Sequence, residues 1–128
     1  SHLRQSDRRL VMDVGGDEVG ARVLGSLSDV VPIDDTDCWL VLNFRRPSTP
    51  DPERALEMVR EIEAVGRLQV SGLISNTHLM DETTAEIVLD GYRQAVETGR
   101  ACVAAGHRNG RRCSLNRGRW LRDRLRKR

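Results

Sequence analysis

Short apolar runs alternate with segments of helical periodicity along most of this 128-residue chain, and this alternation restricts its possible folds more than any other feature. Residues 9–14, 38–43 and 68–75 are apolar runs of strand length, with centres that suit burial on both faces of a sheet. Strands that alternate with helices predict βαβ units with right-handed crossovers. We therefore expect an α/β fold with a parallel sheet of about three strands flanked by helices.

The first two expected helices have recognisable ends. Residues 18–27 favour a short helix, although two glycines lie inside it. Asp51 is placed to cap the second helix, with Pro52 at its first position and Gly66 as its C-terminal stop. Apolar residues recur along the second helix at steps of three and four, so one of its faces should pack on the sheet.

A third helix is expected to follow a cap at Asp81 and to end at Gly99. Its predicted packing stripe consists of Ala85, Val88, Leu89, Tyr92, Ala95 and Val96. After Gly99, glycine, arginine and asparagine dominate and the helical pattern fades. The sequence thus predicts an α/β domain over residues 1–98 and a weakly ordered basic tail over residues 99–128.

The net charge changes from negative to positive at the same boundary, between residues 98 and 99. Residues 1–98 contain 10 Arg against 18 Asp or Glu, whereas residues 99–128 contain 11 Lys or Arg against one Asp. The tail could bind nucleic acid or an anionic membrane surface, lie on the acidic body of the same chain, or be non-native sequence. The last two interpretations are favoured, because the tail has little periodicity and few aromatic residues between its arginines.

Cysteine content and hydropathy bear on the cellular setting. Three cysteines form an odd set without a C-x-x-C pair, which favours reduced thiols and a cytoplasmic location. The spacing of Cys102, His107 and Cys113 fits no standard zinc pattern. The longest apolar run, residues 38–42, is too short to cross a bilayer, so no membrane span is expected.

Asp13 ends the first apolar run and is followed by Gly15 and Gly16. A carboxylate at the C-terminal tip of a parallel strand lies where open α/β sheets bind ligands, and its oxygen suits Mg²⁺. The glycines would let the backbone approach a phosphate and would permit a positive φ. Alternatively, Asp13 caps the helix that follows. Lys127 is the single lysine, so no G-x-x-x-x-G-K-[ST] phosphate loop exists in this chain.

Other charged residues allow two interpretations. Arg45 and Arg46 could face phosphates, but a solvated pair beside a turn is favoured. Asp17 and Glu18 could act as switch residues, although acids that complement a helix dipole are the simpler explanation. His78 lies in an expected loop and is assigned to the polar surface rather than to catalysis.

Three stretches together resemble the later part of the MinD/ParA/CobQ-like, or SIMIBI-class, P-loop ATPases. They read DVGGDEVGARVLG from residue 13, LVLNFRRPST from residue 40 and GLISNTHLMDET from residue 72. The resemblance covers residues 10–98 and is greatest to a bacterial branch with a DVGGD-x-x-GARxLG stretch. It implies that this chain forms a partial Rossmann-like sheet. In an intact relative, the domain would bind ATP and Mg²⁺ and couple hydrolysis to a conformational or dimerisation switch.

The resemblance also implies roles for single residues. Asp13 matches the Walker B aspartate, which helps to organise Mg²⁺ and the attacking water. Gly16, beside Gly15, matches the switch glycine whose amide senses the γ-phosphate. Asn76 matches an asparagine that commonly contacts the adenine base, and Asn43 ends a strand beside the same expected cleft.

The chain departs from this group where phosphate is bound, because the first strand, the phosphate loop and the first helix have no counterpart. Each missing charge-assisted contact is worth about 1.5–3 kcal/mol. We therefore expect at most weak nucleotide binding and negligible ATPase activity from this chain alone. In this group the missing strand lies beside the Walker B strand, inside the sheet. An exposed edge would invite a homodimer or a complementing N-terminal half.

Overall fold

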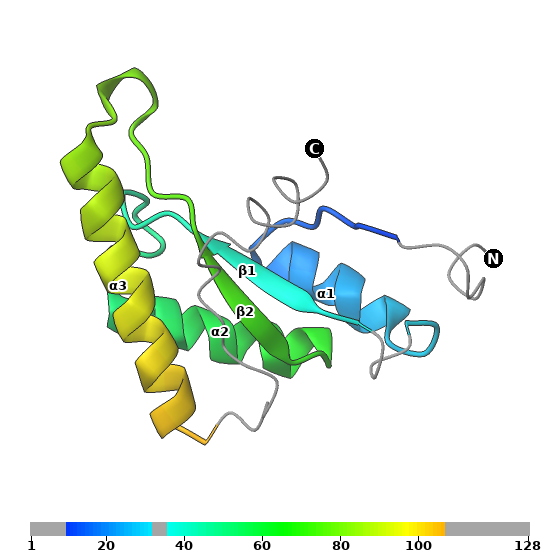
Figure 1. Ribbon diagram of the computed structural model, residues 1–128. Coiled ribbons are helices and arrows are strands. Elements are labelled where there is room, and N and C mark those ends of the chain that lie inside the picture. The colour runs from blue at the N-terminus through cyan, green and yellow to red at the C-terminus, as the bar shows by residue number, and fades with distance from the viewer. Residues whose placement is uncertain (1–9, 32–35, 107–128) are drawn as a thin grey trace, which may run out of the picture.

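The computed structural model describes residues 10–31 and 36–106. Three α-helices, two β-strands and one short 3₁₀ helix follow each other in that part of the chain (Figure 1). In chain order they are α1 (Glu18–Leu27), β1 (Cys38–Leu42), α2 (Pro52–Gly66), β2 (Val70–Ser75), η3 (Met80–Glu82) and α3 (Ala85–Ala104). The predicted α/β class is confirmed, and the basic tail from residue 107 onward lies outside the described residues.

β1 and β2 form a parallel two-stranded sheet, and α2 is the crossover between them. The register sets Leu40 beside Leu73 and Trp39 beside Gly72. Adjacent parallel strands joined through a helix are the βαβ arrangement that the alternating pattern predicts. β1 begins at its predicted residue and ends one residue early, whereas β2 begins two residues late and ends at its predicted residue.

The predicted strand over residues 9–14 does not form in its described part. Residues 10–14 have no strand partner, and Leu10 and Val11 are 58% and 93% exposed. An apolar run becomes a strand only where another strand supplies hydrogen-bond partners. In the described part of the chain β1 pairs with β2 alone, so the parallel sheet has two strands there instead of about three.

Local caps explain why α1 and α2 match their predicted bounds. The Asp17 carboxylate accepts a hydrogen bond from Gly20 N at 2.8 Å, and Asp51 accepts one from Arg54 N at 2.8 Å. Both side chains satisfy amides that the first helical turn leaves unpaired. Asp17 therefore caps α1, so the alternative that Asp13 caps this helix is wrong, and Asp17 precedes the first turn in which the sequence analysis placed it. The left-handed residue that closes α2 is Arg67, with φ of 53°, directly after Gly66.

Both predicted ends of the third helix are wrong. Thr84 caps α3 by accepting a hydrogen bond from Ile87 N, while Asp81 lies in the preceding 3₁₀ helix. The helix also continues past Gly99 to Ala104. Gly99 is buried inside the helix, so close packing explains its presence better than a C-terminal stop does.

The buried face of α3 also differs from the predicted stripe. Its buried residues include Gly91, Ala95, Thr98 and Cys102, whereas Val88, Leu89 and Tyr92 remain exposed. Small residues let the helix approach the rest of the domain closely. A Cβ built on Gly91 would lie only 2.2 Å from Thr77 Cβ. The larger side chains of Val88, Leu89 and Tyr92 therefore lie on the flank of α3 and not on its buried face.

The core lies on one face of the sheet. Leu40, Leu42 and Leu73 are buried there with residues of α2, including Ala55, Val59 and Ile62. The opposite face is less covered, since Trp39 and Val41 are 48% and 55% exposed. In Figure 1 the two strands lie in front of α1 and α2, with α3 beside β2. No helix among the described residues is long and apolar enough to cross a membrane.

Candidate functional site

The carboxyl ends of β1 and β2 lie side by side, because the strands are parallel and paired in register. Asn43 follows β1, and Asn76 follows β2. The Asn76 backbone N–H donates to Leu42 O at 2.8 Å, which extends the ladder past the last strand residue. Two sequence-predicted site residues therefore occupy the edge where open α/β sheets bind ligands.

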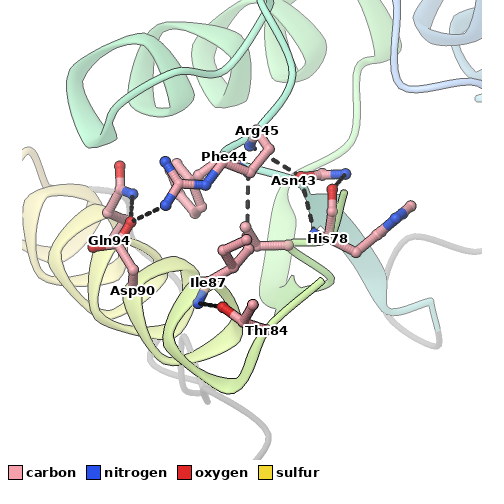
Figure 2. Close-up of polar contacts among 9 residues, drawn as sticks. Asn43, Phe44, Arg45, His78, Thr84, Ile87, Asp90 and Gln94 are labelled. Carbon is pink, nitrogen blue, oxygen red and sulfur yellow. Dashed lines mark hydrogen bonds and ion pairs between the residues drawn. The ribbon is translucent and has the colours of Figure 1, made fainter. Parts of the chain in front are cut away.

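The Asn43 side chain clamps the two loops together (Figure 2). Its Oδ1 accepts hydrogen bonds from His78 N at 3.3 Å and Arg45 N at 3.0 Å, and its Nδ2 donates to His78 O at 3.2 Å. The two bonds between Asn43 and His78 span 35 residues of sequence. Asn43 therefore fixes the shape of this edge, and its predicted contact with nucleotide stays a prediction.

Two threonines that the sequence analysis did not single out support the same edge. Buried Thr77 accepts a hydrogen bond from Phe44 N at 3.2 Å through its Oγ1. Buried Thr49 donates from its Oγ1 to Asn43 O at 2.9 Å. Hydroxyls that satisfy loop backbone in this way carry no periodic signal, so only the three-dimensional arrangement identifies them.

The Asn76 side chain is in a different position from that of Asn43. It is exposed at the carboxyl edge, and no side-chain hydrogen bond engages its amide. A carboxamide offers both a donor and an acceptor, which is what recognition of a base edge requires. Of the two asparagines at this edge, Asn76 is the one whose amide is available to a ligand.

His78 is half-buried, and a backbone contact determines its tautomer. Its Nδ1 accepts a hydrogen bond from Met80 N at 3.3 Å, so Nε2 carries the proton of the neutral ring. Met80 has a left-handed φ of 51°, which turns its amide into the loop. His78 thus contributes to loop shape, and its assignment to the polar surface rather than to catalysis stays a prediction.

Arg45 makes an ion pair with α3. Its guanidinium lies 3.2 Å from Asp90 Oδ2, and Gln94 Nε2 donates to the same oxygen at 3.0 Å (Figure 2). The Arg45 and Asp90 side chains are 38% and 43% exposed, so solvent screens much of this attraction. Arg45 therefore positions the loop after β1 against α3, while exposed Arg46 has no ion pair to a described residue.

Asp13, Gly15 and Gly16 precede the cap of α1, and all three are exposed. A Cβ at Gly16 would meet nothing within 4 Å, which leaves room for a ligand to approach that backbone. Neither Gly15 nor Gly16 uses the positive φ that the sequence analysis considered possible. Gly20 is required for another reason, because a Cβ there would lie 1.8 Å from Gly15 O.

Asp13 is the metal ligand that the sequence analysis predicts. No group of three or more His, Cys, Asp or Glu residues that could hold a metal occurs within residues 10–31 and 36–106. An exposed carboxylate can give one oxygen to Mg²⁺, whose remaining ligands in nucleotide sites are phosphates and waters. Asp13 fits that arrangement only together with a bound nucleotide.

The Cys38 thiol is not activated for chemistry. Burial raises its pKa above the usual 9.0, and the nearby Glu63 carboxylate raises it further. Because the thiolate is the reactive form, Cys38 is a poor nucleophile at neutral pH. Neither Cys38 nor Cys102, the two cysteines in the described ranges, forms a disulfide bond with a described residue.

No family model, curated protein or solved structure matches this chain.

Proposed function

We propose that this chain is part of an ATP-binding domain of the MinD/ParA/CobQ-like group, and that its ligand lies at the carboxyl edge of β1 and β2. The observation that carries the proposal is the arrangement of Asn43 and Asn76 at this edge. Asn43 locks the two loops together while the Asn76 amide remains exposed beside them. A rigid loop pair that presents one open carboxamide is suited to contact a planar base.

In this proposal the remaining residues contribute to the phosphate side. Asp13 would supply one oxygen to Mg²⁺ and help to orient the attacking water. The Gly16 amide would approach the γ-phosphate, which agrees with the open space around that residue. Chemistry of this kind depends on positioning and charge stabilisation rather than on a covalent intermediate.

Two features support the view that the site is incomplete in this chain. Residues 10–14 have no strand partner, and one edge of β1 is bare in the described part. A further strand that carries a phosphate loop would give both of them a neighbour, as the sheet of the resembling group does. Without that loop, the amides and lysine that hold phosphates are missing, so the affinity should be about 1 mM or weaker.

Nucleotide binding is tested by NMR titration of the ¹⁵N-labelled full chain with ATP and MgCl₂. The expected result is a weak, saturable shift of the amides around Asn76, Gly15 and Gly16. Asn76→Ala should weaken the response several-fold, by about 1 kcal/mol for one hydrogen bond. Gln69→Ala is the matched control, since Gln69 is an exposed amide at the opposite end of β2. Shifts confined to other surfaces would contradict the proposed site.

Hydrolysis is tested separately by measuring released phosphate with ATP and Mg²⁺. The expected result is no turnover above background. Clear turnover that Asp13→Ala abolishes would show that the site is complete in this chain. The NMR titration and this assay therefore test the location of the site and its incompleteness independently.

A further inference from the structure

The face of the sheet opposite the core is apolar and little covered by the described residues. Trp39 and Val41 of β1 are 48% and 55% exposed there, and half-buried Ile74 of β2 pairs with Val41. The Trp39 indole lies over Gly72, since its Cδ1 is 3.4 Å from a Cβ built on that glycine. The ring therefore spans both strands on this face.

α3 extends the apolar surface beyond β2. Val88 and Tyr92 lie one turn apart on one flank of the helix and are 48% and 38% exposed. On the other flank Asp90 bonds Gln94 and also Arg45, in the loop that leads to α2. α2 covers the core face of the sheet, so the flank of Val88 is turned toward the opposite face. We call the combined surface the open face, which consists of Trp39, Val41, Ile74, Val88 and Tyr92.

The segment that continues from α3 can reach the open face. In Figure 1 α3 runs back along β2 from the loop after that strand, so its end lies toward the amino end of the sheet. Gly106 follows α3 with a left-handed φ of 77°, which turns the chain out of the helix. Even in a helix, at about 1.5 Å per residue, residues 107–128 would reach about 33 Å, whereas β2 is about 20 Å long. The segment is therefore long enough to cross the open face.

The same segment matches the open face in composition. Residues 107–128 contain ten Lys or Arg and one Asp, whereas the described residues contain eight Arg and fifteen Asp or Glu. The large apolar residues of the segment include Trp120, Leu121 and Leu125. Exposed Asp37 lies two residues before Trp39, at the amino end of the sheet. A cationic segment with a short apolar group therefore suits an apolar face on an acidic domain.

We propose that residues 107–128 fold back across the open face of the same chain, with Trp120, Leu121 and Leu125 against its apolar side chains and the arginines toward surrounding carboxylates. Arginine stems can cover apolar surface while their guanidinium groups stay in water. Covalent attachment gives the segment an effective concentration on the order of 1 mM, which favours it over a second copy. The contact requires neither nucleotide nor a phosphate loop, so it goes beyond the proposed function and stands independently of it.

A nitroxide label on Cys113 of the full chain tests this contact by NMR. Cys38→Ser and Cys102→Ala leave one thiol for labelling, and circular dichroism shows whether this variant is folded. In the ¹⁵N-labelled chain, amides of the open face should lose intensity relative to the ascorbate-reduced label. The amide of Glu57, which is exposed on α2, should keep its intensity.

Substitutions in the segment test which side chains make the contact. Leu121→Ser combined with Leu125→Ser should restore the intensity of the open-face amides, because the segment loses apolar area to bury. Val19→Ser combined with Val23→Ser is the matched control on α1, where these valines are 69% and 47% exposed. The control should leave the broadening unchanged.

Tryptophan fluorescence provides a second measurement that keeps all three cysteines. Trp39 and Trp120 are the two tryptophans of the chain, so Trp120→Phe leaves Trp39 as the single reporter on the open face. Leu121→Ser with Leu125→Ser in this background should raise the acrylamide quenching constant of Trp39 about twofold, because removal of two leucines uncovers the indole. The α1 control pair should leave the constant unchanged.

Three results would overturn the proposal. One is full intensity at every open-face amide, or broadening at Glu57 instead. Another is broadening of an unlabelled ¹⁵N chain mixed with a labelled ¹⁴N chain, which would assign the contact to a second copy. The third is a Trp39 quenching constant that the two leucine substitutions do not change.

Discussion

At the scale of single residues, Asn43 and Asn76 occupy equivalent positions directly after a strand, but their side chains have different structural roles. Asn43 makes three side-chain hydrogen bonds, two of which join the loops after β1 and β2, whereas the Asn76 side chain is exposed. Asn43→Ala should lower the free energy of unfolding by about 1–3 kcal/mol, because it leaves loop backbone groups without partners. Asn76→Ala should change it by less than about 0.5 kcal/mol. Urea denaturation followed by circular dichroism measures both values, and equal losses would contradict the clamp.

Cys38 gives a prediction for pH dependence at the same scale. Its pKa is raised above 9.0 in the folded chain, first by burial and then by Glu63. A raised pKa means that the folded state holds the thiol proton more tightly than the unfolded state does. The resulting stabilisation is fully present below pH 9 and is lost as pH rises through the folded pKa.

We therefore expect Cys38→Ser to reduce the fall in stability between neutral pH and the region above pH 9, compared with the wild type. Urea unfolding midpoints at several pH values measure this difference. Cys102→Ser serves as the comparison, since it removes the other cysteine thiol of the described ranges. A wild-type and a Cys38→Ser profile that run parallel would show that Cys38 does not contribute.

At the scale of elements, what could be predicted depends on how local the determining contacts are. α1 and α2 match their predicted bounds because Asp17, Asp51 and Pro52 fix the helix starts within one turn. β1 and β2 are near their expected bounds for a similar reason, since apolar runs and turn residues delimit them. The candidate edge follows from the parallel pairing of these two strands.

The elements that differ from prediction depend on distant partners. A strand over residues 9–14 would need a neighbouring strand, and none pairs with its described part. The buried face of α3 is set by the approach of Gly91 to Thr77, which lies in another loop. The Asn43 clamp likewise joins residues 35 apart. Periodicity and composition contain no record of such pairings, so the sequence could not reveal them.

The contact between α3 and the loop after β2 can be tested through Gly91. A Cβ there would lie 2.1 Å from Thr77 Oγ1, so Gly91→Ala must push α3 or the loop away. The clash should cost about 1–3 kcal/mol of unfolding free energy, more than the gain of about 1 kcal/mol in helix propensity. Gly66→Ala is the control, because its Cβ would meet neighbours at an ordinary 3.6 Å. A neutral Gly91→Ala in thermal and urea unfolding would contradict the close approach.

At the scale of the whole molecule, two kinds of surface remain without a partner. Apolar side chains are exposed on one face of the sheet and on the flank of α3, among them Trp39, Val41, Val88 and Leu89. Large exposed apolar side chains indicate an interface where they form a contiguous patch.

The split in charge is the other whole-molecule feature, and it separates the proposed ATP-binding function from the nucleic-acid alternative. The basic region contains eleven Lys or Arg and one Asp after residue 98, but α3 continues to Ala104, so a deletion should begin at residue 107. If the arginines serve only as a general cationic segment, the full chain should bind duplex DNA with Kd of about 1 μM or weaker at ~0.15 M salt. Fluorescence anisotropy over a salt series measures this, with the 1–106 chain as the comparison. Binding at nanomolar Kd in ~0.15 M salt that the deletion abolishes would instead identify nucleic acid as the partner.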